Sequence, residues 1–322
     1  MKTTDALAVS GPDIGTPMQS HVLTIIGAAE IDPAIVASIA SEAAALAGAM
    51  FGVAPTRRTL SPGRAEEVYV TPTADANAND FVEAAREVAG DAPVDLAVLS
   101  NVYRRKKLLI ADMDSTIIGQ ECLDELADFA GLKAEISAVT ERAMRGELQF
   151  EEALRARVAK LKGLAADALD RTYAERISLT TGAAALTGTM RAHGAMTILA
   201  SGGFTFFTGR VAAASGFERN VANVIEISDG LLTGTVREPI FGREGKAETM
   251  RASCAELGLS PDDALAVGDG ANDLGMIEAA GLGVAFRAKP AVALAADARV
   301  DNGDLTSLLY LQGYTDEEIV EW

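Results

Sequence analysis

The stretch LLIADMDSTIIGQE, residues 108–121, opens with four apolar residues, and Asp112 and Asp114 follow them closely. The apolar run predicts a short buried strand over 108–111. Side chains two residues apart on an extended chain lean the same way, so both carboxylates would enter one crevice. Like charges this close repel unless a cation lies between them or one carboxyl keeps its proton. The pair predicts either an oxygen site for a hard cation such as Mg²⁺ or an acidic turn, and the rest of the chain must decide.

The composition is that of a folded, acidic protein. The chain has 322 residues, of which 49% are hydrophobic and 23% charged, and its formal net charge is -18. This length predicts two domains. Nucleic acid and anionic membranes attract basic surfaces, so neither is an expected partner. A phosphate-binding site on this chain would have to create its own local positive field.

Several features predict a cytoplasmic protein. Cys122 and Cys254 lie in no Cys-x-x-Cys or metal-ligand pattern, which indicates buried thiols in a reducing compartment. No apolar run approaches the ~18 residues of a membrane span. Residues 1–20 lack the order of a signal peptide and predict a flexible tail. His21 and His193 are far apart in sequence, and neither is a catalytic candidate.

Residues 21–100 predict a small α+β domain with a ferredoxin-like order of elements. The expected order is a strand over 21–26, a helix over 34–50, two strands over 57–60 and 66–71, a helix over 80–88 and a strand over 94–99. This order resembles the ACT-type regulatory fold, which often binds amino acids. Residues 27–32 lack the further glycine usual in ACT ligand loops, so a structural or dimer-forming role is favoured over effector binding. The charged residues here are scattered as on a solvated surface, and no chemistry is expected of them.

After residue 119 the apolar spacing becomes helical, and about 60 residues pass before the next strand. This is more than a crossover helix needs, so residues 119–180 predict an inserted helical cap. Strands and helices then alternate, which predicts a Rossmann-like, three-layer parallel sheet over 105–322. The expected helices are 123–130, 133–144, 150–161, 166–176, 181–193, 204–215, 245–257 and 274–280; the expected strands are 196–200, 264–267 and 282–286, with a hairpin over 223–238.

Three of these strands end in polar clusters, where ligands bind in parallel sheets. Asp112 and Asp269, with Asp273 outside them, predict an oxygen cage for Mg²⁺. A Ser-Gly-Gly turn at 201–203, placed before a helix, suits an anion. Lys246 stands near a helix start, which disfavours cations, and a bound phosphate facing it would explain that position. Metal, lysine and backbone amides would neutralise a phosphoryl group, and an aspartate would serve as nucleophile.

In order, these clusters resemble the four motifs of the haloacid-dehalogenase-like hydrolases. The motifs are Asp112-Met113-Asp114-Ser115-Thr116, Ser201-Gly202, Lys246 and Gly268-Asp269-Gly270-Ala271-Asn272-Asp273. Within that superfamily, the DMDST form, Glu121 and the cap stretch 146–161 resemble the phosphoserine phosphatase family. The resemblance covers about 105–310. Met113 stands where the family often has Phe, and both are apolar.

The resemblance implies hydrolysis of O-phospho-L-serine to L-serine and phosphate, the last step of serine biosynthesis, through an aspartyl-phosphate. Asp112 would be the nucleophile and Asp114 the general acid/base. The implied Mg²⁺ ligands are Asp112, the backbone carbonyl of Asp114, and Asp269, supported by Asp273. The implied phosphate ligands are Ser201, Gly202, Lys246 and Asn272. Glu121 would bind the substrate ammonium, Arg157 its carboxylate, and Phe150 and Met144 would form the apolar underside of the cap.

The residue types support this assignment, since a zwitterion needs one anion and one cation, and Arg suits a carboxylate. Arg155 lies on the same predicted helix as Arg157, so either could belong to a solvated face. Two alternatives stay open. One is a phosphatase of the same superfamily with another small phosphomonoester substrate. The other is an amino-acid-binding regulatory protein without catalysis.

Overall fold

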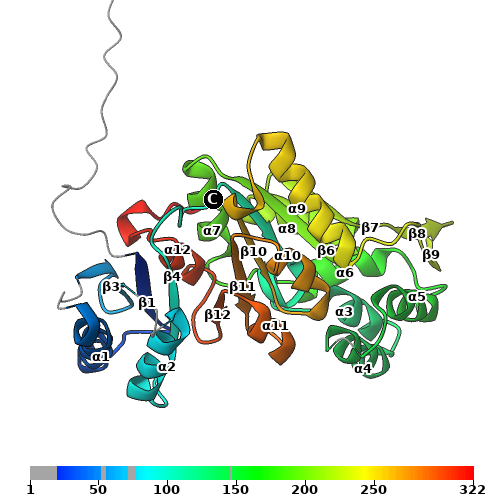
Figure 1. Ribbon diagram of the computed structural model, residues 1–322. Helices are drawn as coiled ribbons and strands as arrows, with labels where there is room; N and C mark the ends of the chain where they lie inside the picture. Colours follow the sequence, from blue (N-terminus) through cyan, green and yellow to red (C-terminus); the bar gives the residue numbers. More distant parts are fainter. Residues whose placement is uncertain (1–19, 52–55, 72–76, 146) are drawn as a thin grey trace, which may run out of the picture.

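The computed structural model describes residues 20–51, 56–71, 77–145 and 147–322. Figure 1 shows two units side by side, with a helical cap on the far side of the second. The flexible tail predicted for residues 1–20 lies, apart from Ser20, outside the described residues, and so does Gly146 of the cap stretch. None of the described helices is long and apolar enough to cross a membrane.

The N-terminal unit has the predicted ferredoxin-like order of elements. Its antiparallel sheet runs β2-β3-β1-β4. Helices α1 and α2 pack on one face through an apolar cluster that includes Leu23, Ile39 and Phe81. The elements are β1 (His21–Gly27), α1 (Pro33–Phe51), β2 (Arg57–Ser61), β3 (Ala65–Val70), α2 (Ala78–Ala89) and β4 (Val94–Ser100).

The second unit contains the predicted parallel sheet, with the strand order β12-β11-β10-β5-β6-β7. Alternate residues of β5 face opposite layers: Leu109 packs with α7 and α8, and Ile110 with α9, α10 and α11. The strands are β5 (Leu108–Ala111), β6 (Met196–Phe204), β7 (Arg219–Asn223), β10 (Ala264–Gly268), β11 (Leu282–Phe286) and β12 (Ala298–Val300). The helices are α7 (Ala183–Ala192), α8 (Thr205–Ser215), α9 (Arg243–Leu257), α10 (Leu274–Ile277), α11 (Pro290–Ala295) and α12 (Ser307–Leu311).

The cap consists of four helices between β5 and α7: α3 (Cys122–Asp128), α4 (Lys133–Met144), α5 (Phe150–Lys160) and α6 (Asp167–Arg176). The two ends of this segment are joined, because the Gly119 amide donates to the Ser178 carbonyl and the Thr180 amide to the Ile117 carbonyl. The predicted hairpin, β8 (Ile225–Ser228) and β9 (Leu231–Val236), lies beside α5. Three backbone hydrogen bonds of 2.8–2.9 Å attach it to residues 163–166.

Several elements differ from the sequence predictions. Residues 201–203 are not a turn, because β6 continues through them to Phe204 after a register shift against β7. Helix α10 is shorter than the predicted 274–280. Strands β7 and β12 and helices α11 and α12 were not predicted. All four are short, so their periodicity is a weak signal, and the two strands lie at the sheet edges.

The prediction that the charged residues of 21–100 are scattered on a solvated surface is wrong for two of them. Asp95 of β4 is buried, and it accepts hydrogen bonds of 3.0, 3.1 and 2.7 Å from the amides of Asp301, Asn302 and Gly303. Glu67 of β3 is fully buried, and it pairs with Arg104 at 2.6 Å.

Both carboxylates belong to the junction between the two units. The apolar cluster of the second unit also takes in Ile26, Leu60, Ala65 and Ala97 from the N-terminal sheet. The face of that sheet opposite α1 and α2 is therefore part of a shared core, close to α12 and β12. The predicted domain boundary near residue 100 stays a prediction.

Candidate active site

The chain turns sharply where β5 ends. Residues Met113–Ile117 form one wide turn, closed by a hydrogen bond from the Ile118 amide to the Met113 carbonyl, in which Asp114 and Ser115 do not have helical backbone angles. Ser115 has a positive φ of 53°, which is uncommon for a residue with a side chain. Residues in such sparsely populated backbone conformations cluster at active sites. The turn places Asp112 and Asp114 at the carboxyl edge of the sheet, between the ends of β10 and β6.

Lys246 is fully buried in the first turn of α9 and pairs with two carboxylates. Its Nζ lies 2.7 Å from Asp112 and 2.6 Å from Asp273. Burial alone would lower the pKa of Lys246, but the charges of Asp112 and Asp273 outweigh burial and raise it. Burial and the charge of Asp273 raise the pKa of Asp112 to about 8. The lysine therefore keeps its charge in a cluster that favours protonated carboxyls.

Asp273 organises the loop after β10. One carboxylate oxygen pairs with Lys246, and the other accepts from the amides of Asp269 and Gly270 at 3.2 and 3.1 Å. A Cβ at Gly268 would lie 2.4 Å from this carboxyl group, so the packing requires glycine there.

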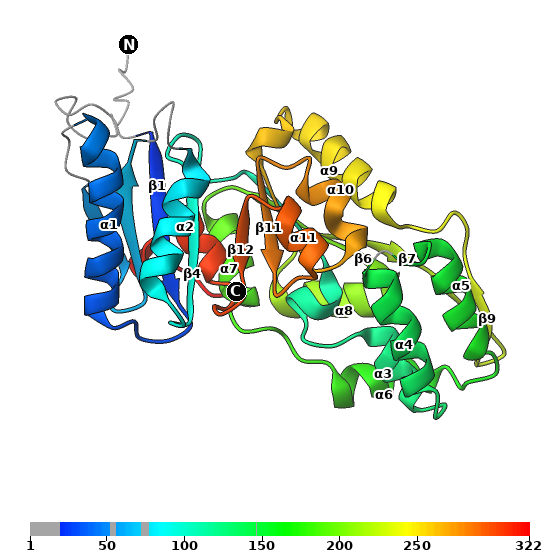
Figure 2. The ribbon, with the colours of Figure 1, turned by 60° about the horizontal axis from the view of Figure 1, so that its bottom comes forward.

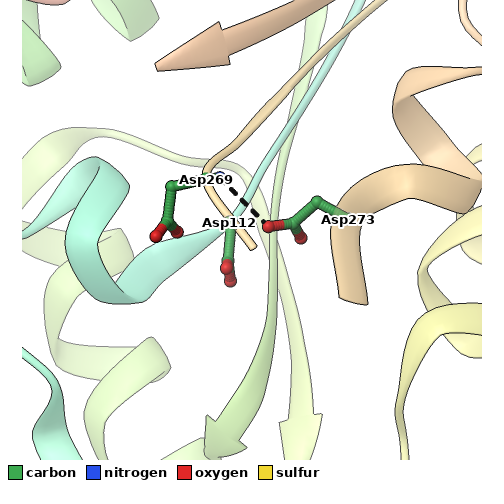
Figure 3. A group of neighbouring side chains, drawn as sticks. All are labelled: Asp112, Asp269 and Asp273. Carbon is green, nitrogen blue, oxygen red and sulfur yellow. Dashed lines mark hydrogen bonds between the residues drawn. The ribbon is translucent and has the colours of Figure 1, made fainter. Parts of the chain in front are cut away.

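A divalent cation fits between three of these carboxylates. Asp112, Asp269 and Asp273 each offer an oxygen within 4.8 Å of the others, and Figure 3 shows the three side chains together. Burial and the charges of Asp273 and Asp112 raise the pKa of Asp269 well above its usual range. Lys246 alone offsets only part of this negative charge, and carboxylate oxygens are the ligands that Mg²⁺ prefers.

Asp114 lies apart from this trio and has different partners. Its carboxylate accepts from the Cys122 amide at 2.8 Å and from the Ser201 hydroxyl at 3.2 Å. Burial raises the pKa of Asp114, and these donors offset part of that rise. The same Ser201 hydroxyl accepts from the Gly203 amide at 2.8 Å, so this serine ties Asp114 to the extended end of β6.

Glu121 returns to the site because the chain folds back on itself. The Ser115 amide donates to the Gln120 carbonyl, and the Ser115 hydroxyl donates to the Glu121 carboxylate at 2.6 Å. Burial, and then the charge of Asp114, raise the pKa of Glu121 well above its usual range. The carboxylate is thus fixed at the cap entrance.

A pocket of about 380 Å³ separates the sheet edge from the cap. Asp112, Asp114, Glu121, Met144, Phe150, Arg157, Gly202 and Asn272 all line it. Asp269, Asp273, Lys246 and Ser201 lie directly behind this lining, buried and bonded to each other or to it. The structure therefore brings together every residue named from the sequence.

The structure also separates the two arginines of α5. Arg155 is exposed and pairs with Glu238 at 2.9 Å, whereas Arg157 is buried and faces the pocket. Phe150 packs so closely on Gly202 that a Cβ there would lie 2.5 Å from its ring. The cap thus presents one cation and an apolar surface to the aspartates.

Sequence reasoning missed several residues of this pocket, among them Thr140, Gln149, Arg243 and Glu244. It also missed the buried Asp124, which bonds to Thr140. All of them lie on or beside helices and match no motif. A helical threonine gives no signal in a single sequence, because most such residues face solvent or neighbouring turns.

The parallel sheet, the helical cap and the acidic edge between them define a capped hydrolase of the α/β class. The haloacid dehalogenase-like hydrolase family profile matches residues 109–278, more than half of the chain. The chain belongs to this family.

Within the family, the chain is similar to proteins described as phosphoserine phosphatases. That of Polaromonas sp. is 47% identical over 210 residues, covering 64% of this chain and 89% of the relative. A solved structure of a phospho-aspartyl intermediate analogue of phosphoserine phosphatase has 35% identity and a TM-score of 0.62, over 64% of this chain and 98% of that one. The unliganded probable phosphoserine phosphatase from Vibrio cholerae has 30% identity and a TM-score of 0.71, over 92% of this chain and 86% of that one.

Proposed function

We propose that this protein is a phosphoserine phosphatase. The observation that carries the proposal is that Glu121 and Arg157 both line the pocket that Asp112 faces. An anion and a cation facing one reactive carboxylate suit a phosphorylated amino acid, whose ammonium and carboxylate they would bind. The names of the relatives support the same substrate.

In the proposed reaction, a carboxylate oxygen of Asp112 attacks phosphorus, and the bond from phosphorus to the serine oxygen breaks. Asp114 gives its proton to that oxygen, which leaves as the serine hydroxyl. Asp114 then accepts a proton from water, whose oxygen attacks phosphorus and releases phosphate from Asp112. The raised pKa of Asp114 favours the protonated form that the first step needs.

Phosphate binding is assigned to groups around Asp112. Lys246 keeps its positive charge there, Gly202 and Asn272 line the pocket, and Ser201 lies directly behind. Phe150 and Met144 cover the site from the cap and exclude water, which strengthens every charge interaction beneath them.

The proposal includes Mg²⁺, held by Asp112, Asp269 and the backbone carbonyl of Asp114. When bound, the ion would neutralise charge on the transferred phosphoryl group. Asp273 already binds Lys246 and two backbone amides, so we assign it to supporting the site. The two buried free thiols, Cys122 and Cys254, support a cytoplasmic location. Assembly into a homodimer stays a prediction.

A phosphate-release assay with three matched substrates tests the proposal. Phosphoserine carries both groups, phosphoethanolamine lacks the carboxylate, and 3-phosphohydroxypropionate lacks the ammonium. We expect kcat/KM to be highest for phosphoserine by at least about tenfold. Arg157→Met should remove the preference over phosphoethanolamine, and Glu121→Gln should reduce the preference over 3-phosphohydroxypropionate. Equal rates on all three would favour another small phosphomonoester, and no hydrolysis with Mg²⁺ would favour a regulatory protein.

A further inference from the structure

The proposed substrate-binding arginine is held by a chain of buried side chains. The Arg157 Nη1 donates to the Thr140 hydroxyl at 2.7 Å, and that hydroxyl donates to an Asp124 carboxylate oxygen at 2.6 Å. The exposed fractions of Asp124, Thr140 and Arg157 are 6%, 4% and 6%. These residues belong to α3, α4 and α5, so the chain connects three cap helices.

The direction of each hydrogen bond follows from the groups present. A guanidinium only donates and a carboxylate only accepts, so the threonine hydroxyl has to accept from one and donate to the other. Thr140 could also donate to the Ile136 carbonyl, but that distance is 3.2 Å and the one to Asp124 is shorter. A second contact, from Arg157 Nε to the Ala153 carbonyl at 3.2 Å, fixes the plane of the guanidinium.

The hydroxyl keeps Asp124 from forming a direct ion pair with the arginine. The 22 ion pairs found among the described residues do not include Arg157. Burial lowers the pKa of Arg157, and the charges of Asp124 and Glu121 offset part of that lowering. A guanidinium has five N–H donors, and here neutral oxygen atoms accept from one on Nε and one on Nη1. Both donors of Nη2 remain for a ligand, and no carboxylate of a described residue bonds to Arg157 and neutralises its charge in the pocket.

We propose that Thr140 and Asp124 are positioning residues that orient Arg157 for the carboxylate of the substrate. The inference deepens the proposed function and rests on it. Removing the Thr140 hydroxyl would leave Arg157 Nη1 and the Asp124 carboxylate without their buried partner. The guanidinium would then turn toward Asp124, and recognition of the carboxylate would weaken while the reacting groups stay in place.

The test compares phosphoserine with phosphoethanolamine, which has no carboxylate to recognise. In Thr140→Val we expect kcat/KM for phosphoserine to fall by roughly tenfold, mainly through KM. The rate on phosphoethanolamine should change less than about twofold, since that substrate does not use Arg157. Thr140→Ser keeps the hydroxyl and should stay within about threefold of the wild type on both substrates.

A double-mutant cycle separates positioning from general damage to the cap. In an Arg157→Met background, adding Thr140→Val should change phosphoserine hydrolysis by less than about twofold, because the arginine through which it acts is gone. The positioning role is wrong if Thr140→Val lowers kcat/KM equally for both substrates. It is also wrong if Thr140→Val lowers phosphoserine hydrolysis as much in the Arg157→Met background as in the wild type. The role is also wrong if Thr140→Ser, which keeps the hydroxyl, loses the preference for phosphoserine over phosphoethanolamine.

Asp124→Asn provides a second variant if Thr140→Val does not fold, since its side-chain oxygen can still accept from Thr140 while the charge is lost. We expect a smaller fall in the ratio of the two kcat/KM values, and an unchanged ratio would overturn the role of Asp124. Failure of the proposed function is visible separately, in the wild type alone. If the unmodified protein does not prefer phosphoserine over phosphoethanolamine, the substrate assignment itself is wrong.

Discussion

The junction between the two units and the acidic edge of the parallel sheet both contain buried carboxylates, but these have very different partners. In the junction, Asp95 accepts from three successive backbone amides, and Glu67 pairs with the guanidinium of Arg104. At the sheet edge, Asp112 and Asp273 share the ammonium of Lys246.

The difference shows what separates a structural carboxylate from a reactive one. Burial does not, because Glu67 and Asp273 are both fully buried. What differs is how the carboxylates are matched by partners. In the junction each one has its own donors, three amides for Asp95 and a guanidinium for Glu67, whereas Asp112, Asp269 and Asp273 gather around one ammonium. Such a surplus of carboxylates favours binding of a cation, whereas a matched carboxylate only joins two parts of the chain.

The largest effect is expected from Asp112→Asn, which removes the proposed nucleophile from the sheet edge. Phosphate release should fall by about 10⁴-fold or more, because an amide cannot form the acyl-phosphate. Thermal unfolding should be almost unchanged, since Lys246 keeps Asp273 and one repelling charge is gone. Asp262→Asn, at an exposed position, is the control. Residual activity within tenfold of the wild type would show that Asp112 is not the nucleophile.

Asp95→Ala should give the opposite result in the junction. Three amides, one of them in the buried Gly303, lose their acceptor, so we expect the free energy of unfolding to fall by about 3 kcal/mol. The kcat/KM for phosphoserine should change less than about threefold. Denaturant unfolding and the phosphate assay measure the two quantities, with the exposed Asp91→Ala as control. A large loss of activity in a still folded variant would mean that the junction contributes to catalysis.

Binding of Mg²⁺ sharpens the comparison, because among the described residues only Asp112, Asp269 and Asp273 form an acidic group that could hold a metal ion. At ten times its Kd, the ion should raise the free energy of unfolding by about 1.4 kcal/mol. This Mg²⁺-induced increase should be much smaller in Asp269→Asn than in the wild type, and in Asp95→Ala it should equal that of the wild type. Melting temperatures with and without MgCl₂ test this. An equal rise in Asp269→Asn and wild type would place the ion elsewhere.

The smallest effect is expected from Glu121→Gln and depends on pH. Burial raises the pKa of Glu121, so between its ordinary value of 4.5 and the raised value the folded protein binds more protons than the unfolded chain. This carboxyl therefore makes the free energy of unfolding fall as pH rises through that window. In metal-free buffer, the free energy of unfolding of Glu121→Gln, measured relative to that of the wild type, should increase as the pH is raised from 5 to 8. A constant difference would contradict the raised pKa.

The sequence predicted the catalytic edge far better than the junction. Asp112, Asp114 and Asp269 stand directly after apolar strands, and parallel topology alone brings strand ends together. Asp95 and Glu67 lie within strands, and their partners are distant in sequence. The partner of Glu67 is more than 30 residues away, and the partners of Asp95 are up to 208 residues away. Thr140 was missed for a related reason, because its role depends on how α3, α4 and α5 pack. Local periodicity contains neither kind of information.

The β8–β9 hairpin has a consequence for the size of substrate that the protein can admit. It follows β7 of the main sheet, yet its backbone is bonded to residues 163–166 of the cap. The cap is therefore attached by its own two ends and by this third connection. A wide swing away from the aspartates must break three backbone hydrogen bonds or move the hairpin as well. We therefore expect the site to favour free phosphorylated metabolites over a phosphorylated side chain on a folded protein.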